Sequence, residues 1–106
     1  MGLLEEMVEE VRLDVMGAYG IGDGIDVMES NKPEYVIVRQ VSTYIVFMCL
    51  GLGYTHTGRV IWGIDHSTVR SSIGKVELEM ERGGAYGHIA MRLIDKYRDK
   101  YKGVTE

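Results

Sequence analysis

The chain has 106 residues, the length of one ordinary domain. Hydrophobic residues make up 45% of it and charged residues 26%, a balance typical of globular rather than disordered proteins. The single cysteine, Cys49, excludes an internal disulfide framework and a cysteine-cluster zinc site. The longest apolar run is much shorter than the ~20 residues of a membrane span, and the N-terminus is acidic where a secretory signal is basic. We therefore expect a soluble, cytoplasmic protein.

The charge of −4 is unevenly distributed. Residues 1–30 contain eight acids and one base, Arg12, whereas residues 31–106 are mildly positive. A general polyanion binder is usually basic, so the negative net charge argues against one. Because the negative charge is concentrated in residues 1–30, nucleic acid stays open as a partner of the rest of the chain. The same contrast divides the chain into an acidic helix with a glycine-rich connection, residues 1–30, and a helical domain, residues 31–106.

Helical spacing dominates the first half of the sequence. It predicts a helix over about residues 3–16, whose apolar face consists of Leu4, Met7, Val8, Val11 and Val15. Four glycines within residues 17–26 predict a turn or mobile connection. A helix start follows at residues 30–33, where proline fits the first turn. The apolar residues from there to Leu50 predict a buried helix; many are β-branched, which leaves a buried strand as an alternative that the length disfavours.

Three further helices are predicted in the second half. A short helical segment over residues 55–62 is followed by Asp65, an N-cap candidate whose carboxylate can accept from the amides of Ser67 or Thr68. Ile64 and Val69 flank it at the spacing of a hydrophobic staple. That helix ends at two glycines, and a last helix covers about residues 86–101. The prediction is an all-α protein, a small helical bundle.

The segment at about residues 55–82 has the proportions of a helix-turn-helix. In that motif the N-terminal residues of the second helix reach base edges in the major groove. Here they are Asp65, His66, Ser67, Thr68, Arg70 and Ser71. A carboxylate accepts from cytosine N4, an imidazole donates to purine acceptors, and a threonine methyl packs on thymine. The alternative is an exposed polar helix start without a ligand, because capped helices are common in helical hairpins.

A wider pattern spans roughly residues 31–80, and it consists of Arg39-Gln40-Val41, Gly58, Gly63 and Asp65-His66-Ser67-Thr68-Val69. This pattern resembles the C-terminal DNA-binding domain of the bacterial chromosomal replication initiator DnaA. That family pairs an Arg-Gln at a helix start with a downstream Gly-Gly-Arg-Asp-His-(Thr/Ser)-Thr-Val. The resemblance implies a Trp-repressor-like helical fold that binds a short asymmetric box of double-stranded DNA as a monomer.

The resemblance also implies roles for single residues. Residues 65–68 match the base-reading start of the recognition helix, and Arg39 and Gln40 match positions that contact the DNA backbone. Lys75 matches a basic position farther along that helix. The family's basic minor-groove loop corresponds to the region of Asn31 and Lys32, where one base remains.

Further departures concern the corner before the recognition helix. Ile64 stands where the family has arginine, and Trp62 stands where it has the first glycine. Each lost phosphate contact weakens affinity and its salt dependence, so we expect weaker binding than in a typical member. The sequence contains no Gly-x-x-x-x-Gly-Lys-(Ser/Thr), so ATP-driven origin melting is not expected of this chain on its own.

Other chemistry has little support in the sequence. The three histidines lack His-x-x-x-His spacing for zinc, and Asp65 and His66 are neighbours whose side chains diverge, which disfavours a hydrolase. We expect Cys49 to be an inert core thiol and Trp62 to brace the corner. We expect no enzyme activity, no cofactor, no membrane and no small-molecule substrate.

The leading hypothesis is a module that binds double-stranded DNA in replication initiation or its regulation, in a bacterium, a phage or another mobile element. The alternative is an adaptor that keeps the fold without DNA affinity and binds a protein partner through the acidic N-terminal helix. That helix has a simpler interpretation too, as a solvated face whose apolar stripe packs onto the domain.

Overall fold

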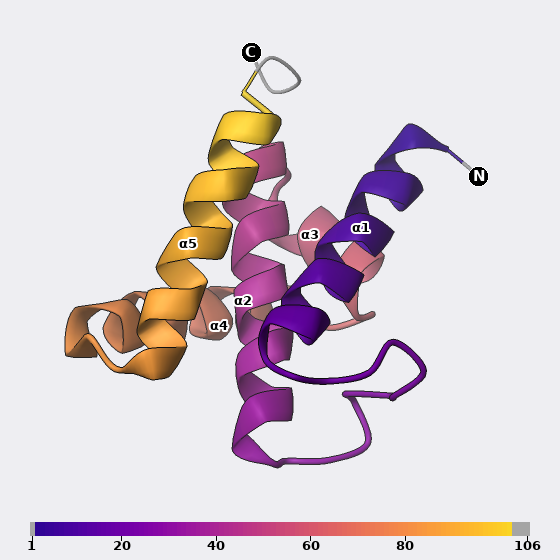
Figure 1. The fold of residues 1–106 in the computed structure, drawn as a ribbon. Coiled ribbons are helices and arrows are strands. Elements are labelled where there is room, and N and C mark those ends of the chain that lie inside the picture. The colour runs from indigo at the N-terminus through magenta and orange to yellow at the C-terminus, as the bar shows by residue number, and fades with distance from the viewer. Residues whose placement is uncertain (1, 103–106) are drawn as a thin grey trace.

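The computed structural model describes residues 2–102, and all regular secondary structure in this range is helical (Figure 1). The helices are α1 (Leu3–Ala18), α2 (Pro33–Leu50), α3 (Tyr54–Ile61), α4 (His66–Arg82) and α5 (Ala85–Lys100). The predicted all-α bundle is confirmed. The β-branched stretch after Pro33 forms the helix α2 and not the alternative strand.

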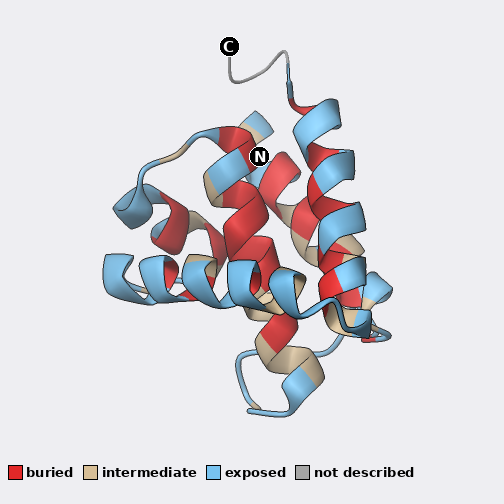
Figure 2. Cartoon of the chain, turned by 90° about the vertical axis from the view of Figure 1, so that its left-hand side faces the viewer, coloured by how far each residue is buried: buried red, intermediate tan, exposed pale blue. Residues whose placement is uncertain are grey.

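The central element of the bundle is α2, which contacts each of the other four helices. Its apolar residues lie on most sides of the helix, and Val38, Val41, Ile45 and Val46 are completely buried. Figure 1 shows α1 and α5 on either side of α2, with α3 and α4 behind it. Buried residues gather where the helices meet, and the outer faces are exposed (Figure 2).

The N-terminal helix α1 is part of this core. Val8, Val11 and Val15 are at most 1% exposed, so the apolar stripe packs onto the domain as its spacing predicted. The helix ends two residues later than expected, where the Ile21 amide donates to the Met16 carbonyl at 2.9 Å and closes a Schellman-type cap. Ile21 and Val27 are buried, so the connection to α2 is anchored to the core.

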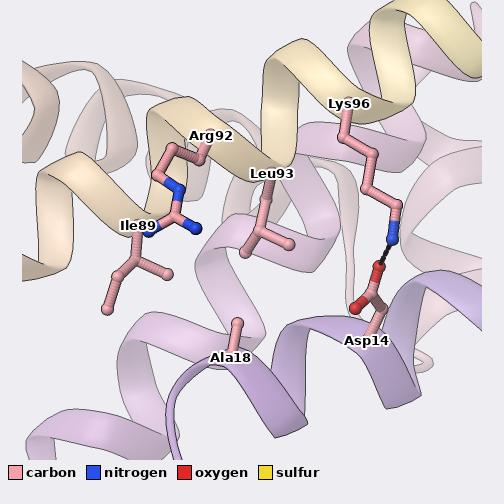
Figure 3. Close-up of a pocket in the computed structure, with 6 residues that line it drawn as sticks. All are labelled: Asp14, Ala18, Ile89, Arg92, Leu93 and Lys96. Atoms are coloured by element: carbon pink, nitrogen blue, oxygen red, sulfur yellow. Dashed lines mark hydrogen bonds and ion pairs between the residues drawn. The ribbon is translucent and has the colours of Figure 1, made fainter.

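Two acidic residues of α1 bind α5 in a repeating pattern. Asp14 accepts from the Lys96 ammonium and, at 2.7 Å, from the Tyr97 hydroxyl. One turn earlier on α1, Glu10 accepts from the Lys100 ammonium and, at 2.6 Å, from the Tyr101 hydroxyl. Figure 3 shows the Asp14–Lys96 pair beside a cleft of about 330 Å³ between the two helices. Two of the five acids on α1 therefore stabilise its docking on α5, and we call these two acids and their four partners at the C-terminal end of α5 the α1–α5 ladder.

The ladder makes the stability of the protein sensitive to acid. Hydrogen bonds from Lys100 and Tyr101 hold the pKa of Glu10 below its usual value. Burial alone raises the pKa of Asp14, but the hydrogen bonds from Lys96 and Tyr97 outweigh it and lower that pKa as well. A carboxylate whose pKa is lower in the folded chain stabilises the fold above its unfolded pKa, and that contribution is lost as the pH falls through the folded pKa.

We therefore expect the free energy of unfolding to decrease as the pH is lowered below about 5, with the ladder contributing to the slope. Urea unfolding at several pH values checks this. The double variant Lys96→Met/Lys100→Met is expected to show a shallower acid dependence than the wild-type chain. Arg82→Met removes an exposed ion pair within α4 and serves as the control. An unchanged slope in the double variant contradicts the role of the ladder.

Candidate nucleic-acid interface

At the corner between α3 and α4 the backbone turns back and packs closely against α3. Two glycines make this possible. The Ile64 amide donates to the Gly58 carbonyl at 3.0 Å, which turns the chain back against α3. A Cβ atom on Gly58 would lie 2.2 Å from the Ile64 carbonyl oxygen, so a larger residue does not fit without moving the backbone. Gly63 has a φ of +67°, a conformation that glycine adopts without steric cost. These features fix the direction in which α4 leaves the corner.

Asp65, which directly precedes α4, caps this helix as predicted. Its Oδ1 accepts from the Thr68 amide at 2.8 Å and from the Ser67 hydroxyl at 2.9 Å. The hydrogen bond from the Thr68 amide is the main reason that the pKa of Asp65 lies below its usual value, with a further contribution from Ser67. The carboxylate is thus ionised at neutral pH and offers acceptors only.

The predicted base-reading residues form one exposed surface at the start of α4. Asp65, His66, Ser67, Thr68, Arg70 and Ser71 are all exposed. Val69 and Ser72, on the opposite face of the same turns, are buried. The helix therefore presents one face to α2 and α3 and the other to solvent. The structure therefore leaves these polar side chains available to a ligand.

A hollow of about 410 Å³ lies between this surface and the N-terminal half of α2. Five of the predicted contact residues line it, namely Arg39, Gln40, Thr68, Ser71 and Lys75. Its apolar wall consists of Met28, Val36, Trp62 and Ile64, and Asn31 and Ser72 complete it. We call this concavity the α2–α4 hollow. It joins residues from the connection, α2, the corner and α4 into a single surface that carries the two cations Arg39 and Lys75.

The guanidinium of Arg39 is bonded within the protein. It donates to the carbonyls of Val27 and Ser30 at 2.6 and 2.7 Å, and to Asn31 Oδ1 at 3.3 Å. These contacts hold the end of the connection against α2. The residue that the sequence predicts at the DNA backbone therefore also fixes the loop that precedes Lys32.

Two predicted cations lie outside the hollow. Lys32 is exposed at the N-cap position of α2, with its ammonium 5.7 Å from the Tyr35 ring centroid. The Arg70 guanidinium lies 5.0 Å from the ring centroid of Tyr54, and that ring stacks on Phe47 with centroids 4.6 Å apart. Arg39 and Lys75 are thus brought together, whereas Lys32 and Arg70 flank the surface from separate positions.

The side chain of Trp62 braces the corner, as expected. It is partly buried against the core, and its Nε1 donates to the Ser42 hydroxyl of α2 at 2.9 Å. Cys49 is buried, as expected for a core thiol, and burial raises the pKa of its sulfur. Within residues 2–102 no cluster of three His, Cys, Asp or Glu side chains is arranged to hold a metal ion.

Comparison with known proteins gives two clear relatives. The chain is 38% identical to the chromosomal replication initiator protein DnaA 2 of Chlamydia caviae over 107 aligned positions, which cover 93% of this chain and 23% of that protein. It is 37% identical to DnaA 1 of Chlamydia pneumoniae over 78 residues, 74% of this chain and 17% of the relative. The chain is homologous to part of DnaA. The resemblance predicted from residues 31–80 is confirmed.

The part of this chain that aligns with DnaA 2 includes residues of α1. A match over 93% of the chain exceeds residues 31–106, so it extends into the acidic N-terminal part. The chain spans less than a quarter of the length of either DnaA relative. No family model matches the chain. No solved structure matches it significantly. None of the helices in the described part of the chain is long and apolar enough to cross a membrane.

Sequence reasoning missed four residues in and around the α2–α4 hollow. Met28, Val36 and Ser72 line it, although none of them belongs to the recognised pattern. Arg12 contacts the corner from α1, as described below. The one available signal for Arg12 was its isolation, since it is the single base among the first 30 residues.

Proposed function

We propose that this DnaA-like chain binds double-stranded DNA sequence-specifically through a helix-turn-helix formed by α3, the corner and α4. The observation that supports this best is the exposed polar start of α4 next to the α2–α4 hollow, where Arg39 and Lys75 supply positive charge. Both relatives are chromosomal replication initiator proteins, which supports a role in replication initiation or its regulation.

In the proposed docking the start of α4 enters the major groove. The ionised Asp65 accepts from cytosine N4, His66 donates to a purine acceptor, and the Thr68 methyl packs on thymine. Arg39 and Lys75 contact phosphates at the edge of the groove, which fixes the register without reading sequence. Gln40 lies in the same hollow and adds an uncharged hydrogen-bonding group to these backbone contacts.

The two flanking cations complete the proposed footprint. Lys32 stands at the end of the connection, which Arg39 holds in place, and reaches the adjacent groove or its phosphates. Arg70, stacked on Tyr54, lies on the α3 side, where the first helix of such a motif crosses the DNA backbone. The adaptor alternative instead uses the exposed acids of α1, of which Glu5 and Glu6 are not part of the α1–α5 ladder.

Single substitutions at the start of α4 test this proposal. His66→Ala and Thr68→Ala are each expected to cost about 1–3 kcal/mol on the preferred duplex and to reduce discrimination against altered base pairs. The reason is the loss of contacts to base edges, since neither side chain is buried. Fluorescence anisotropy titrations with the preferred duplex and with single-base variants measure both effects.

The matched control is His88→Ala, which removes an exposed histidine from α5. This variant is expected to bind like the wild-type chain. If His66→Ala leaves both affinity and discrimination unchanged while Arg39→Ala alters sequence preference, the proposed docking is wrong.

A further inference from the structure

We infer that Arg12 of α1 is a positioning residue for the DNA-binding surface and acts on it through Trp62. This inference rests on the proposed function, and it gives α1 a part in DNA binding without direct contact to DNA. It depends on a chain of contacts that runs from α1 through the corner to the α2–α4 hollow.

The first link joins α1 to the end of α3. Arg12 Nη1 donates to the carbonyl of Ile61 at 2.7 Å, although the two residues are 49 positions apart. That carbonyl belongs to the last residue of α3. The C-terminal end of a helix favours a positive charge because its unpaired carbonyl groups carry partial negative charge. Glu9, one turn earlier, accepts from the other terminal nitrogen of Arg12 at 2.7 Å and orients the guanidinium.

The second link is the stacking of Arg12 on the corner itself. The guanidinium carbon lies 5.4 Å from the ring centroid of Trp62, within the range of a cation–π interaction. Trp62 also donates through Nε1 to the hydroxyl of Ser42 at 2.9 Å. The indole is therefore held between α1 and α2 by a cation and a hydrogen bond.

The third link is the position of Trp62 in the hollow. Trp62 lines the α2–α4 hollow together with Thr68 and Ser71, both of which belong to the proposed base-reading surface. The Ser42 hydroxyl in turn donates to the Val38 carbonyl at 2.6 Å, one residue before Arg39. A shift of the indole thus changes the wall of the hollow and the spacing between α2 and the start of α4.

A purely structural role for Arg12 is the competing explanation, because α1 contributes to the core. The α1–α5 ladder supplies the comparison needed, since Lys100 also ties α1 to the bundle but through Glu10 and away from the corner. Arg12→Met and Lys100→Met each remove one such tie and keep an unbranched apolar stem. Arg12→Lys keeps the charge and one donor nitrogen but not the planar group that stacks on the indole.

We expect Arg12→Met to weaken binding to the preferred duplex roughly tenfold, within the range of mutations that act on a ligand site without touching it. Lys100→Met is expected to bind like the wild-type chain, and Arg12→Lys to lie between the two. Titrations are made at a temperature where circular dichroism shows each variant to be folded. Trp62 is the single tryptophan, so its fluorescence and its quenching by acrylamide, which carries no charge, report on the corner.

Arg12→Met is expected to increase acrylamide quenching of Trp62 in the free protein, whereas Lys100→Met is not. Equal affinity losses in the folded Arg12→Met and Lys100→Met variants, or unchanged quenching in Arg12→Met, would overturn the inference while the proposed function stands. Failure of the wild-type chain to bind any duplex overturns the proposed function, and the positioning role with it, even if the quenching difference is observed.

Discussion

Gly58→Ala is expected to lower the free energy of unfolding by about 1–3 kcal/mol, a cost typical of forcing an extra methyl group into a packed site. The added Cβ would lie 2.2 Å from the Ile64 carbonyl oxygen and 3.0 Å from Val69 Cγ2. The first of these atoms is backbone, so the corner itself must move. Because the corner sets the direction of α4, the variant is also expected to lose specific DNA binding. Urea unfolding and a duplex titration measure the two effects.

Gly74→Ala is the matched control for this substitution. Gly74 lies within α4, and an added Cβ meets nothing within 4 Å. Replacing a helical glycine with alanine then stabilises the folded chain by about 0.5–1 kcal/mol. If the two variants have the same stability, the corner is not the tight contact that the structure shows.

Arg39→Met is expected to have the second large effect, and it acts on both stability and binding. It leaves the carbonyls of Val27 and Ser30 without their guanidinium donor, and lost hydrogen bonds of this kind cost about 1–3 kcal/mol. It also removes a proposed phosphate contact, so affinity for all duplexes decreases alike and the salt slope decreases by about one unit. Urea unfolding and titrations at several salt concentrations separate the two effects.

Lys75→Met separates the roles further, because Lys75 is exposed and shares the α2–α4 hollow with Arg39. It is expected to reduce the salt slope in the same way with little change in stability. An Arg39→Met variant as stable as Lys75→Met contradicts the role of Arg39 in holding the connection. A change in sequence preference in either variant contradicts their assignment to phosphates.

Local sequence signals were sufficient for most of the fold. The apolar stripe of α1 is a periodic spacing within one helix, and the Asp65 cap joins residues three positions apart, so both can be recognised from a short stretch of sequence. The end of α1 was predicted two residues early because Gly17, in the last turn of the helix, was taken as its end, whereas the cap involves Gly20 and Ile21. The choice of helix over strand for α2 depended on length, since propensity alone left a buried strand as a fair alternative.

The contacts that assemble the proposed interface could not be predicted in this way. Arg12 and Ile61 are 49 positions apart, and no local pattern indicates which cation reaches which distant carbonyl. The pattern around Arg39 was recognised, but its bonds to the connection depend on where Val27 packs, which is a property of the folded chain. The α2–α4 hollow likewise exists only once four segments have come together.

The central claim, specific reading of DNA by the start of α4, is tested most directly by one titration. The purified chain is titrated against a labelled duplex with a DnaA-type box and against a scrambled duplex, at two salt concentrations. We predict tighter binding to the box at both concentrations, with an affinity for each duplex that decreases as salt is added. Absence of binding to both duplexes would contradict the claim and favour the adaptor alternative, and equal salt-sensitive binding to both would contradict specific reading of this box.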